Sequence, residues 1–218
     1  ENMTLRAQKE LPAEIGLAFS PYSPRLQPWL EEARQARRET FLLLPMEPLT
    51  YPKDDPGPRA LLSRKSGAEN REALHWLLAQ GRPTGVMNFM GSRFLADRAN
   101  MMPALEQLRH RGLVFIENPS MAGLQSAASF ASEAGVPYIS ADVKIDITPE
   151  RNAIRQQLVQ LEKAAEQRGA ALGIASPYPV TLDVLREWAA GLERRGFVLS
   201  PPTSLLRQDA SPPSQRSP

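Results

Sequence analysis

Four carboxylates follow short apolar runs of the sequence and are candidates for acid–base chemistry: Glu47, Glu117, Asp142 and Asp146. Two carboxylates held about 5–10 Å apart can hydrolyse a glycosidic bond, one as acid and the other as base or nucleophile. Carboxylates at such positions also cap helices and brace loops. We take Glu47, Asp142 and Asp146 as the candidate catalytic residues, with both roles open.

Other classes of chemistry lack the residues they need. Cysteine is absent, and the two histidines, His75 and His110, lie inside predicted helices away from the strand ends. A serine nucleophile with a histidine base and a histidine-rich zinc site are therefore not expected. Neither a Gly-x-Gly-x-x-Gly nor a Gly-Lys-Ser/Thr motif occurs, so a nucleotide cofactor is not expected either.

The charge balance and the hydropathy pattern exclude two kinds of partner. Lys and Arg total 26 against 24 Asp and Glu, for a formal net charge of +2. An excess this small does not attract nucleic acid, and we expect no nucleic-acid partner. No apolar run approaches the roughly 20 residues of a membrane span.

Helices and strands alternate along most of the chain. Glycines end several helical patterns, as in Glu166-Gln167-Arg168-Gly169, and short apolar or β-rich runs follow them. The predicted strands are residues 15–19, 40–44, 85–88, 113–116, 136–140, 171–175 and 197–199. Alternation of this kind predicts parallel strands with helices outside, in an α/β barrel or a doubly wound sheet. In both architectures the site lies at the carboxyl ends of the strands.

Three segments depart from this alternation. Residues 44–67 hold five prolines, and we expect a rigid flap over a site there. Residues 208–218 are rich in Pro and Ser, which predicts a disordered tail after a single domain of residues 1–207. The chain opens on a helical pattern at residues 2–10 with no strand before it.

Several strand-end phrases occur together in a distinctive order. They are Ile-Gly-Leu-Ala-Phe-Ser-Pro-Tyr at 15–22, Leu-Pro-Met-Glu-Pro at 44–48, Tyr-Pro-Lys-Asp-Asp-Pro-Gly-Pro at 51–58, Gly-Val-Met-Asn-Phe-Met-Gly-Ser at 85–92 and Pro-Tyr-Pro at 177–179. In these phrases the chain resembles the divergent polysaccharide deacetylase family from about residue 11 to residue 206. The resemblance implies an irregular, NodB-like (β/α) barrel whose first strand is missing from this sequence. It also implies carbohydrate metabolism in the bacterial periplasm or cell envelope.

The resemblance further implies a metal site that this chain does not reproduce. Deacetylases of this fold bind a divalent metal such as zinc through an aspartate and two histidines, and the metal-bound water attacks the acetyl carbonyl. In the divergent family the acidic pair lies on the first strand, one histidine follows Asn in Asn-x-Met-Gly, and another precedes Pro-Tyr-Pro. Phe89 and Ser176 stand at those two histidine positions here. We therefore expect no metal cofactor.

The resemblance leaves a set of positions from which a cleft could still be built. We expect Ser20, Tyr22, Glu47, Asn88, Ser176 and Tyr178 to line a substrate-binding cleft. The first hypothesis is a deacetylase-like protein whose cleft meets a glycan or an acetylated amino sugar, with metal-dependent N-deacetylation weakened or lost. The second is a non-catalytic envelope scaffold that binds a protein partner. A third keeps catalysis without metal, through Glu47 with Asp142 or Asp146.

Overall fold

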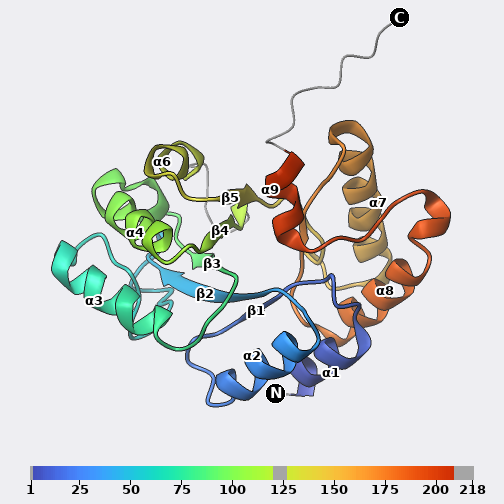
Figure 1. The fold of residues 1–218 in the computed structure, drawn as a ribbon, viewed down its shortest axis with the longest axis horizontal. Coiled ribbons are helices and arrows are strands. Elements are labelled where there is room, and N and C mark those ends of the chain that lie inside the picture. The colour runs from blue at the N-terminus through green and yellow to red at the C-terminus, as the bar shows by residue number, and fades with distance from the viewer. Residues whose placement is uncertain (1, 120–126, 209–218) are drawn as a thin grey trace, which may run out of the picture.

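The computed structural model describes residues 2–119 and 127–208 and has the predicted alternation of helices and strands (Figure 1). The elements are α1 (Asn2–Glu10), β1 (Leu17–Phe19), α2 (Leu26–Gln35), β2 (Thr40–Met46), α3 (Gly67–Leu78), β3 (Gly85–Met90), η1 (Phe94–Ala96), α4 (Arg98–His110), β4 (Val114–Glu117), α6 (Ala128–Ala134), β5 (Tyr138–Ser140), β6 (Val143–Lys144), α7 (Arg151–Arg168), β7 (Gly173–Ile174), α8 (Pro179–Ala190), η2 (Glu193–Arg195), η3 (Pro202–Ser204) and α9 (Leu205–Gln208). The first described element is a helix, as the sequence predicted.

All the paired strands are parallel. Five form one sheet in the order β1-β2-β3-β4-β5, and β6 pairs with β7 in a second, two-stranded sheet. Helices α3, α4 and α6 lie beside the large sheet, while α7 and α8 lie beside β6 and β7 (Figure 1). The α/β class with parallel strands and outer helices is therefore confirmed. Over the described ranges the strands form two sheets and do not close into one barrel.

Two strand predictions need correction. Residues 197–199 have no strand pairing, although Phe-Val-Leu has a β-like composition, and Val198 is 82% exposed. Strand β6 was not predicted, because a two-residue strand at Val143–Lys144 carries too little pattern to detect. The predicted tail lies outside the described residues from 209 onward, and Gln208 ends α9.

Alternating side chains of the strands enter two different cores. Leu42 and Leu44 of β2 and Phe115 of β4 pack under helices α2, α3, α4 and α6. The neighbouring positions, such as Phe41 and Ile116, enter a smaller cluster on the other face, which Leu205 of α9 helps to cover. The period of two along a strand thus produces an outer core under the helices and an inner face that lines the centre of the molecule.

Capping residues that can be recognised in the sequence fix the ends of two helices. Ser66 caps α3 and forms a capping box with Glu69, in which each side chain bonds the other residue's backbone N–H. Gly169 ends α7 with φ +86°, in the left-handed region that suits glycine. Ser66 thus fixes where the flap ends, and Gly169 fixes where the segment leading to β7 begins.

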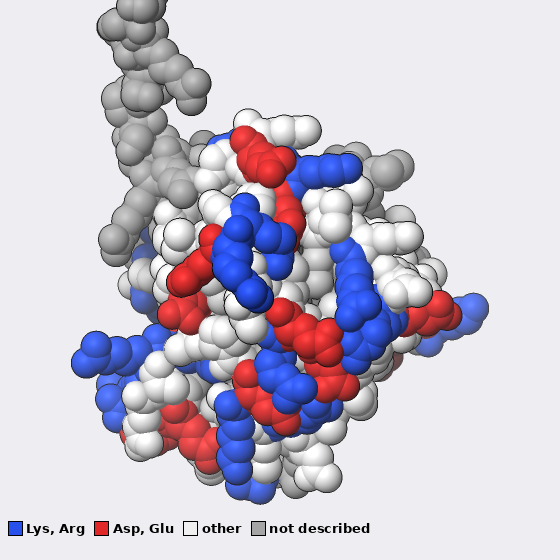
Figure 2. All heavy atoms as spheres, turned by 90° about the vertical axis from the view of Figure 1, so that its right-hand side faces the viewer, with Lys and Arg blue, Asp and Glu red and all other residues white. Residues whose placement is uncertain are grey.

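A face of the molecule that includes α7 and α8 carries both signs of charge side by side (Figure 2). Arg6 of α1 pairs with Glu10 and Asp183, and Glu187 of α8 pairs with Arg151 and Arg155 of α7. The Arg6 hydrogen bond lowers the pKa of the Asp183 carboxyl. Among the described residues, no helix combines the length and the apolar character needed to cross a membrane.

One buried cation connects α1 to the large sheet. The Arg38 guanidinium, only 5% exposed, donates to the carbonyls of Leu11 and Pro12 at 2.8 Å, Ile15 at 2.5 Å and Gln8 at 3.2 Å. Burial lowers the pKa of Arg38. Its donors satisfy carbonyls at the end of α1 and in the loop that follows, and so fix how the chain enters β1.

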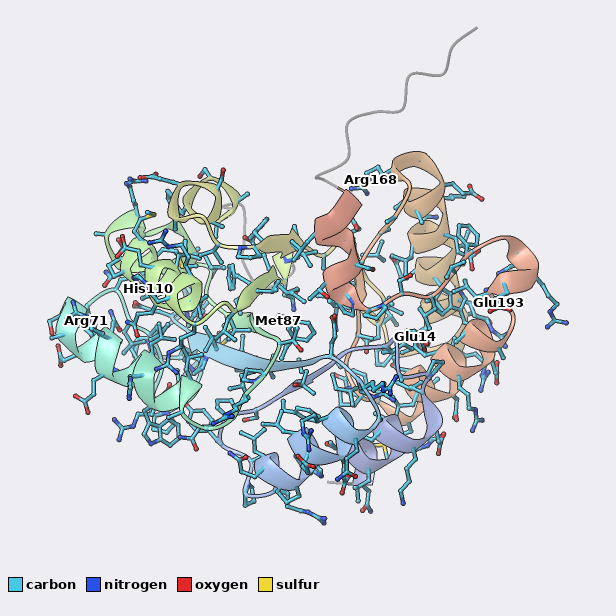
Figure 3. The ribbon with its side chains drawn as sticks, in the orientation of Figure 1. Glu14, Arg71, Met87, His110, Arg168 and Glu193 are labelled. Atoms are coloured by element: carbon cyan, nitrogen blue, oxygen red, sulfur yellow. The ribbon has the colours of Figure 1, made fainter. Side chains whose placement is uncertain are left out.

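Replacing Arg38 by methionine should lower the free energy of unfolding by about 2–4 kcal/mol, because several partly buried carbonyls lose their donors. Urea denaturation measures the change. The control is Arg71→Met, at an exposed arginine of α3 (Figure 3), which should change the stability by less than about 0.5 kcal/mol. Equal and small changes in the two variants would contradict the role assigned to Arg38.

Candidate functional site

A cavity of about 790 Å³ lies at the centre of the molecule. The large sheet contributes Met87 and Phe89 of β3, and the segment before β1 contributes Glu14. Figure 3 shows Met87 and Glu14 well apart, with Glu14 toward the α8 side. A concave site with mostly apolar walls and a few polar groups is the usual form of a ligand pocket.

The cavity is lined by polar residues at strand ends, here called its polar end, and by mostly apolar residues of α7 and α8. Four polar residues come from the ends of strands or the segments just after them: Asn88, Asn118, Lys144 and Ser176. The apolar residues of α7 and α8 include Leu161, Leu185 and Trp188. The α7 side of the lining also includes the carboxylates of Glu162 and Glu166, whereas the strand ends contribute amide, hydroxyl and ammonium groups.

Asn88 lies at this polar end, but its side chain is hydrogen-bonded to the backbone of the protein. Its Nδ2 donates to the carbonyls of Met90 at 2.8 Å and Asn118 at 3.3 Å, and its Oδ1 accepts from the Asn118 N–H at 2.7 Å. The side chain is almost fully buried, with the residue 1% exposed. Asn88 therefore ties the end of β3 to the segment after β4 and positions the cavity wall.

Glu47 lies where the flap leaves β2 and does not line the cavity. Its Oε2 accepts from the Ser63 N–H at 2.5 Å, and its Oε1 lies 3.6 Å from Nε of Arg93. Its backbone bonds Leu61 of the flap and Phe94 of η1. The carboxylate thus holds the flap against the end of β2, and the catalytic role predicted for it stays a prediction.

Tyr22 is part of the same flap support. Its ring stacks on Trp76 with centroids 6.0 Å apart, and its hydroxyl accepts from the Arg59 N–H at 3.1 Å. Burial raises the pKa of Tyr22. Ser20 accepts from the Tyr22 N–H at 3.3 Å in a local turn. These two predicted cleft residues organise the flap and are not among the residues that line the cavity.

Asp142 and Tyr178 also lie outside the cavity lining. Asp142 pairs with Arg168 at 2.6 Å and accepts from the Leu172 N–H at 2.7 Å, so it ties the end of α7 to the start of β7. Tyr178 precedes α8 and is 47% exposed. The structure therefore does not bring Asp142 and Glu47 together in one cavity.

Asp146 is the centre of a second set of contacts that reaches the cavity. Its Oδ1 lies 2.5 Å from Nζ of Lys144. Its Oδ2 accepts from the Ser176 N–H at 2.6 Å and from the Thr181 hydroxyl at 3.2 Å. Lys144 Nζ also donates to Ser176 Oγ at 2.9 Å. The predicted residues Asp146 and Ser176 are thus brought together by a lysine that the sequence analysis did not select.

The sequence did contain a signal for Lys144. It stands between Val143 and Ile145 in a run that ends at Asp146. A lysine between two β-branched residues, two positions before an aspartate, is expected to share a face with that aspartate in a strand. The signal was missed because β6 itself was missed.

A model of the divergent polysaccharide deacetylase family matches residues 1–206. The chain belongs to this family. Two curated relatives are described as uncharacterized. YibQ of Escherichia coli K12 is 24% identical over 219 residues, which cover 95% of this chain and 67% of YibQ. A Haemophilus influenzae Rd protein is 27% identical over 177 residues, which cover 81% of this chain and 62% of that protein. The chain therefore spans about two thirds of the length of these relatives.

A solved structure has the same fold. The crystal structure of the uncharacterized protein ATU2773 from Agrobacterium tumefaciens C58 superposes with a TM-score of 0.90 at 31% identity. The match covers 94% of this chain and 83% of that one. Membership of the divergent deacetylase family and the α/β fold therefore rest on independent comparisons of sequence and structure.

The residues of this family member do not fit the divalent metal that the resemblance implies. Phe89 has no donor atom, and Ser176 Oγ is already bonded to the Lys144 ammonium. A cation beside Asp146 would be repelled by that ammonium 2.5 Å from the carboxylate. Across the described part of the chain, no three His, Cys, Asp or Glu side chains are grouped so that they could hold a metal.

Both histidines lie on outer helices, as predicted. His75 of α3 and His110 of α4 are exposed, and Nδ1 of His75 lies 3.1 Å from a guanidinium nitrogen of Arg111. Figure 3 shows His110 on α4, on the side opposite Glu14 and Arg168. Neither histidine lines the cavity of this deacetylase-family protein.

Changing Asn88 to alanine should lower the free energy of unfolding by about 2–4 kcal/mol, because it removes three hydrogen bonds, two of them to the backbone of Asn118. Thermal and urea denaturation measure the loss. Asn152→Ala, at an exposed asparagine of α7, should stay within about 0.5 kcal/mol of the parent. If Asn88→Ala were as stable as this control, Asn88 would be free to serve a ligand.

Proposed function

We propose that this protein is a glycan-binding member of its family, acting in carbohydrate metabolism of the bacterial periplasm or cell envelope. Its cavity binds N-acetylated amino sugars at the polar end. Metal-dependent N-deacetylation is weak or lost. The observation that carries the proposal is the polar end itself, where Lys144 and Ser176 meet in a central cavity whose residues do not fit a metal.

The chemistry of the cavity wall suits an N-acetyl sugar. Phe89, at the position where the resemblance predicts a histidine, lines the same cavity and offers an apolar ring. An N-acetyl group combines a methyl with a carbonyl and an N–H, so it uses an apolar wall and hydrogen-bond donors together. The replacement of a metal ligand by Phe89 therefore supports binding and opposes metal-dependent hydrolysis.

Phe89→Ala should weaken the binding of chitotetraose, a tetramer of N-acetylglucosamine, by about tenfold, which corresponds to about 1.4 kcal/mol. Isothermal titration calorimetry measures the affinity. The control is Phe130→Ala, because Phe130 of α6 packs on the outer core under the helices and should not alter the affinity. No binding by the parent, or equal losses in the two variants, would contradict a glycan site at Phe89.

Acetate release from chitotetraose measures whether hydrolysis remains. We expect none above background, with or without added zinc, and no zinc retained after removal of the excess. Zinc-dependent release of acetate, with near-stoichiometric zinc, would instead make the protein a metal-dependent deacetylase. Absence of glycan binding altogether would favour the alternative, a non-catalytic envelope scaffold.

A further inference from the structure

Lys144 is an unusual residue for the place it occupies. Its side chain is 19% exposed, at the end of a strand beside Ile145, which is 4% exposed. Lysine is seldom buried to this degree unless it is paired. Its partner is Asp146, whose side chain is fully buried. The pair therefore places a compensated positive charge at the wall of the cavity.

The contacts of Asp146 fix this charge in one position. The carboxylate accepts from the Ser176 N–H and from the Thr181 hydroxyl, which lie in the segment after β7 and in α8. Because Oδ2 is occupied in this way, Oδ1 is left to Lys144. The ammonium cannot move away without leaving a buried carboxylate uncompensated, which is strongly unfavourable. Lys144 is thus a preorganised cation.

The hydrogen-bond directions leave donors for a ligand. An ammonium has three N–H groups and no acceptor. Among the described residues, Nζ is ion-paired with Asp146 Oδ1 at 2.5 Å and donates a hydrogen bond to Ser176 Oγ at 2.9 Å. Since the Ser176 hydroxyl accepts from Lys144, its own hydrogen remains for another acceptor. One N–H of Lys144 and the O–H of Ser176 therefore remain at the polar end of the cavity, which both residues line.

We propose that Lys144 takes the place of the metal ion and that it binds, together with the Ser176 hydroxyl, the carbonyl oxygen of an N-acetyl group. This inference rests on the proposed glycan function and names the group that is recognised. The Lys144–Asp146 pair is neutral overall, so it favours a neutral carbonyl oxygen over a carboxylate, which the buried Asp146 would repel. Ser176 stands at the position where the resemblance predicts a histidine ligand of the metal. The Lys144 ammonium lies 2.9 Å from the hydroxyl oxygen at that position.

The test compares the affinities of chitotetraose and of its fully N-deacetylated form, measured by calorimetry in EDTA. The parent should prefer the acetylated tetramer, and its affinity should be the same in EDTA and in zinc. Lys144→Met, which keeps the length of the stem and removes the charge, should weaken binding of the acetylated tetramer at least tenfold and reduce the preference. Lys163→Met, at an exposed lysine of α7, should leave both affinities unchanged.

A second variant separates binding from folding. Lys144→Met leaves Asp146 uncompensated and should lower the melting temperature. Combining Lys144→Met with Asp146→Asn removes both charges, and the oxygen of the introduced amide can still accept from the Ser176 N–H. This double variant should therefore recover most of the melting temperature. Its affinity for the acetylated tetramer should remain at least tenfold below that of the parent.

Each remaining outcome has a definite meaning. If the parent binds chitotetraose and the double variant binds it equally well, the role of Lys144 is overturned while the proposed function stands. An affinity that rises with zinc overturns the idea that Lys144 replaces the metal. If the parent binds neither tetramer, both this inference and the proposed glycan function fail.

Discussion

The fully buried carboxylate of Asp146 is the constraint on which the arrangement of the cavity depends. A carboxylate removed from water needs a counter-charge and several hydrogen-bond donors, or it is too costly to keep ionised. Lys144 supplies the charge, while the Ser176 N–H and Thr181 supply donors. To meet these demands the end of β6, the segment after β7 and the start of α8 must lie together. The polar end of the cavity therefore follows from satisfying one buried charge.

A comparable demand, with the opposite sign, acts between α1 and β1. The Arg38 guanidinium is buried, and its two terminal nitrogens donate to four backbone carbonyls, with no carboxylate among these acceptors. Backbone carbonyls carry only partial charge, and burial lowers the pKa of Arg38 accordingly. The two sites differ in consequence. Arg38 bonds the backbone and fixes how the chain enters β1. Lys144, in contrast, lines the cavity.

The sequence predicted the α/β class and most strands, whereas the contacts of the candidate site residues could not be predicted from it, and particular residues show why. Glycines such as Gly169 end helices through their own backbone freedom, and apolar runs such as residues 40–44 are long enough to identify a strand. Both are local signals. The role of the Glu47 carboxylate depends on which backbone N–H donates to it. That N–H belongs to Ser63, sixteen positions later. Asn88 similarly meets Asn118, thirty positions away. Such pairings arise only from the fold, so a carboxylate that supports a flap could not be separated from a catalytic one by sequence.

If Lys144 takes the place of the metal as proposed, the chemistry of the site changes and is not simply lost. A metal ion in a deacetylase polarises the carbonyl and also lowers the pKa of a bound water, so it supplies the nucleophile. An ammonium can donate a hydrogen bond to the same carbonyl, but it has no coordination site from which to deliver water. In the proposed role, Lys144 and Ser176 keep the part of the chemistry that recognises an acetyl group and omit the part that cleaves it. Phe89 agrees with this division, because an apolar ring excludes water from the place where hydrolysis would need it.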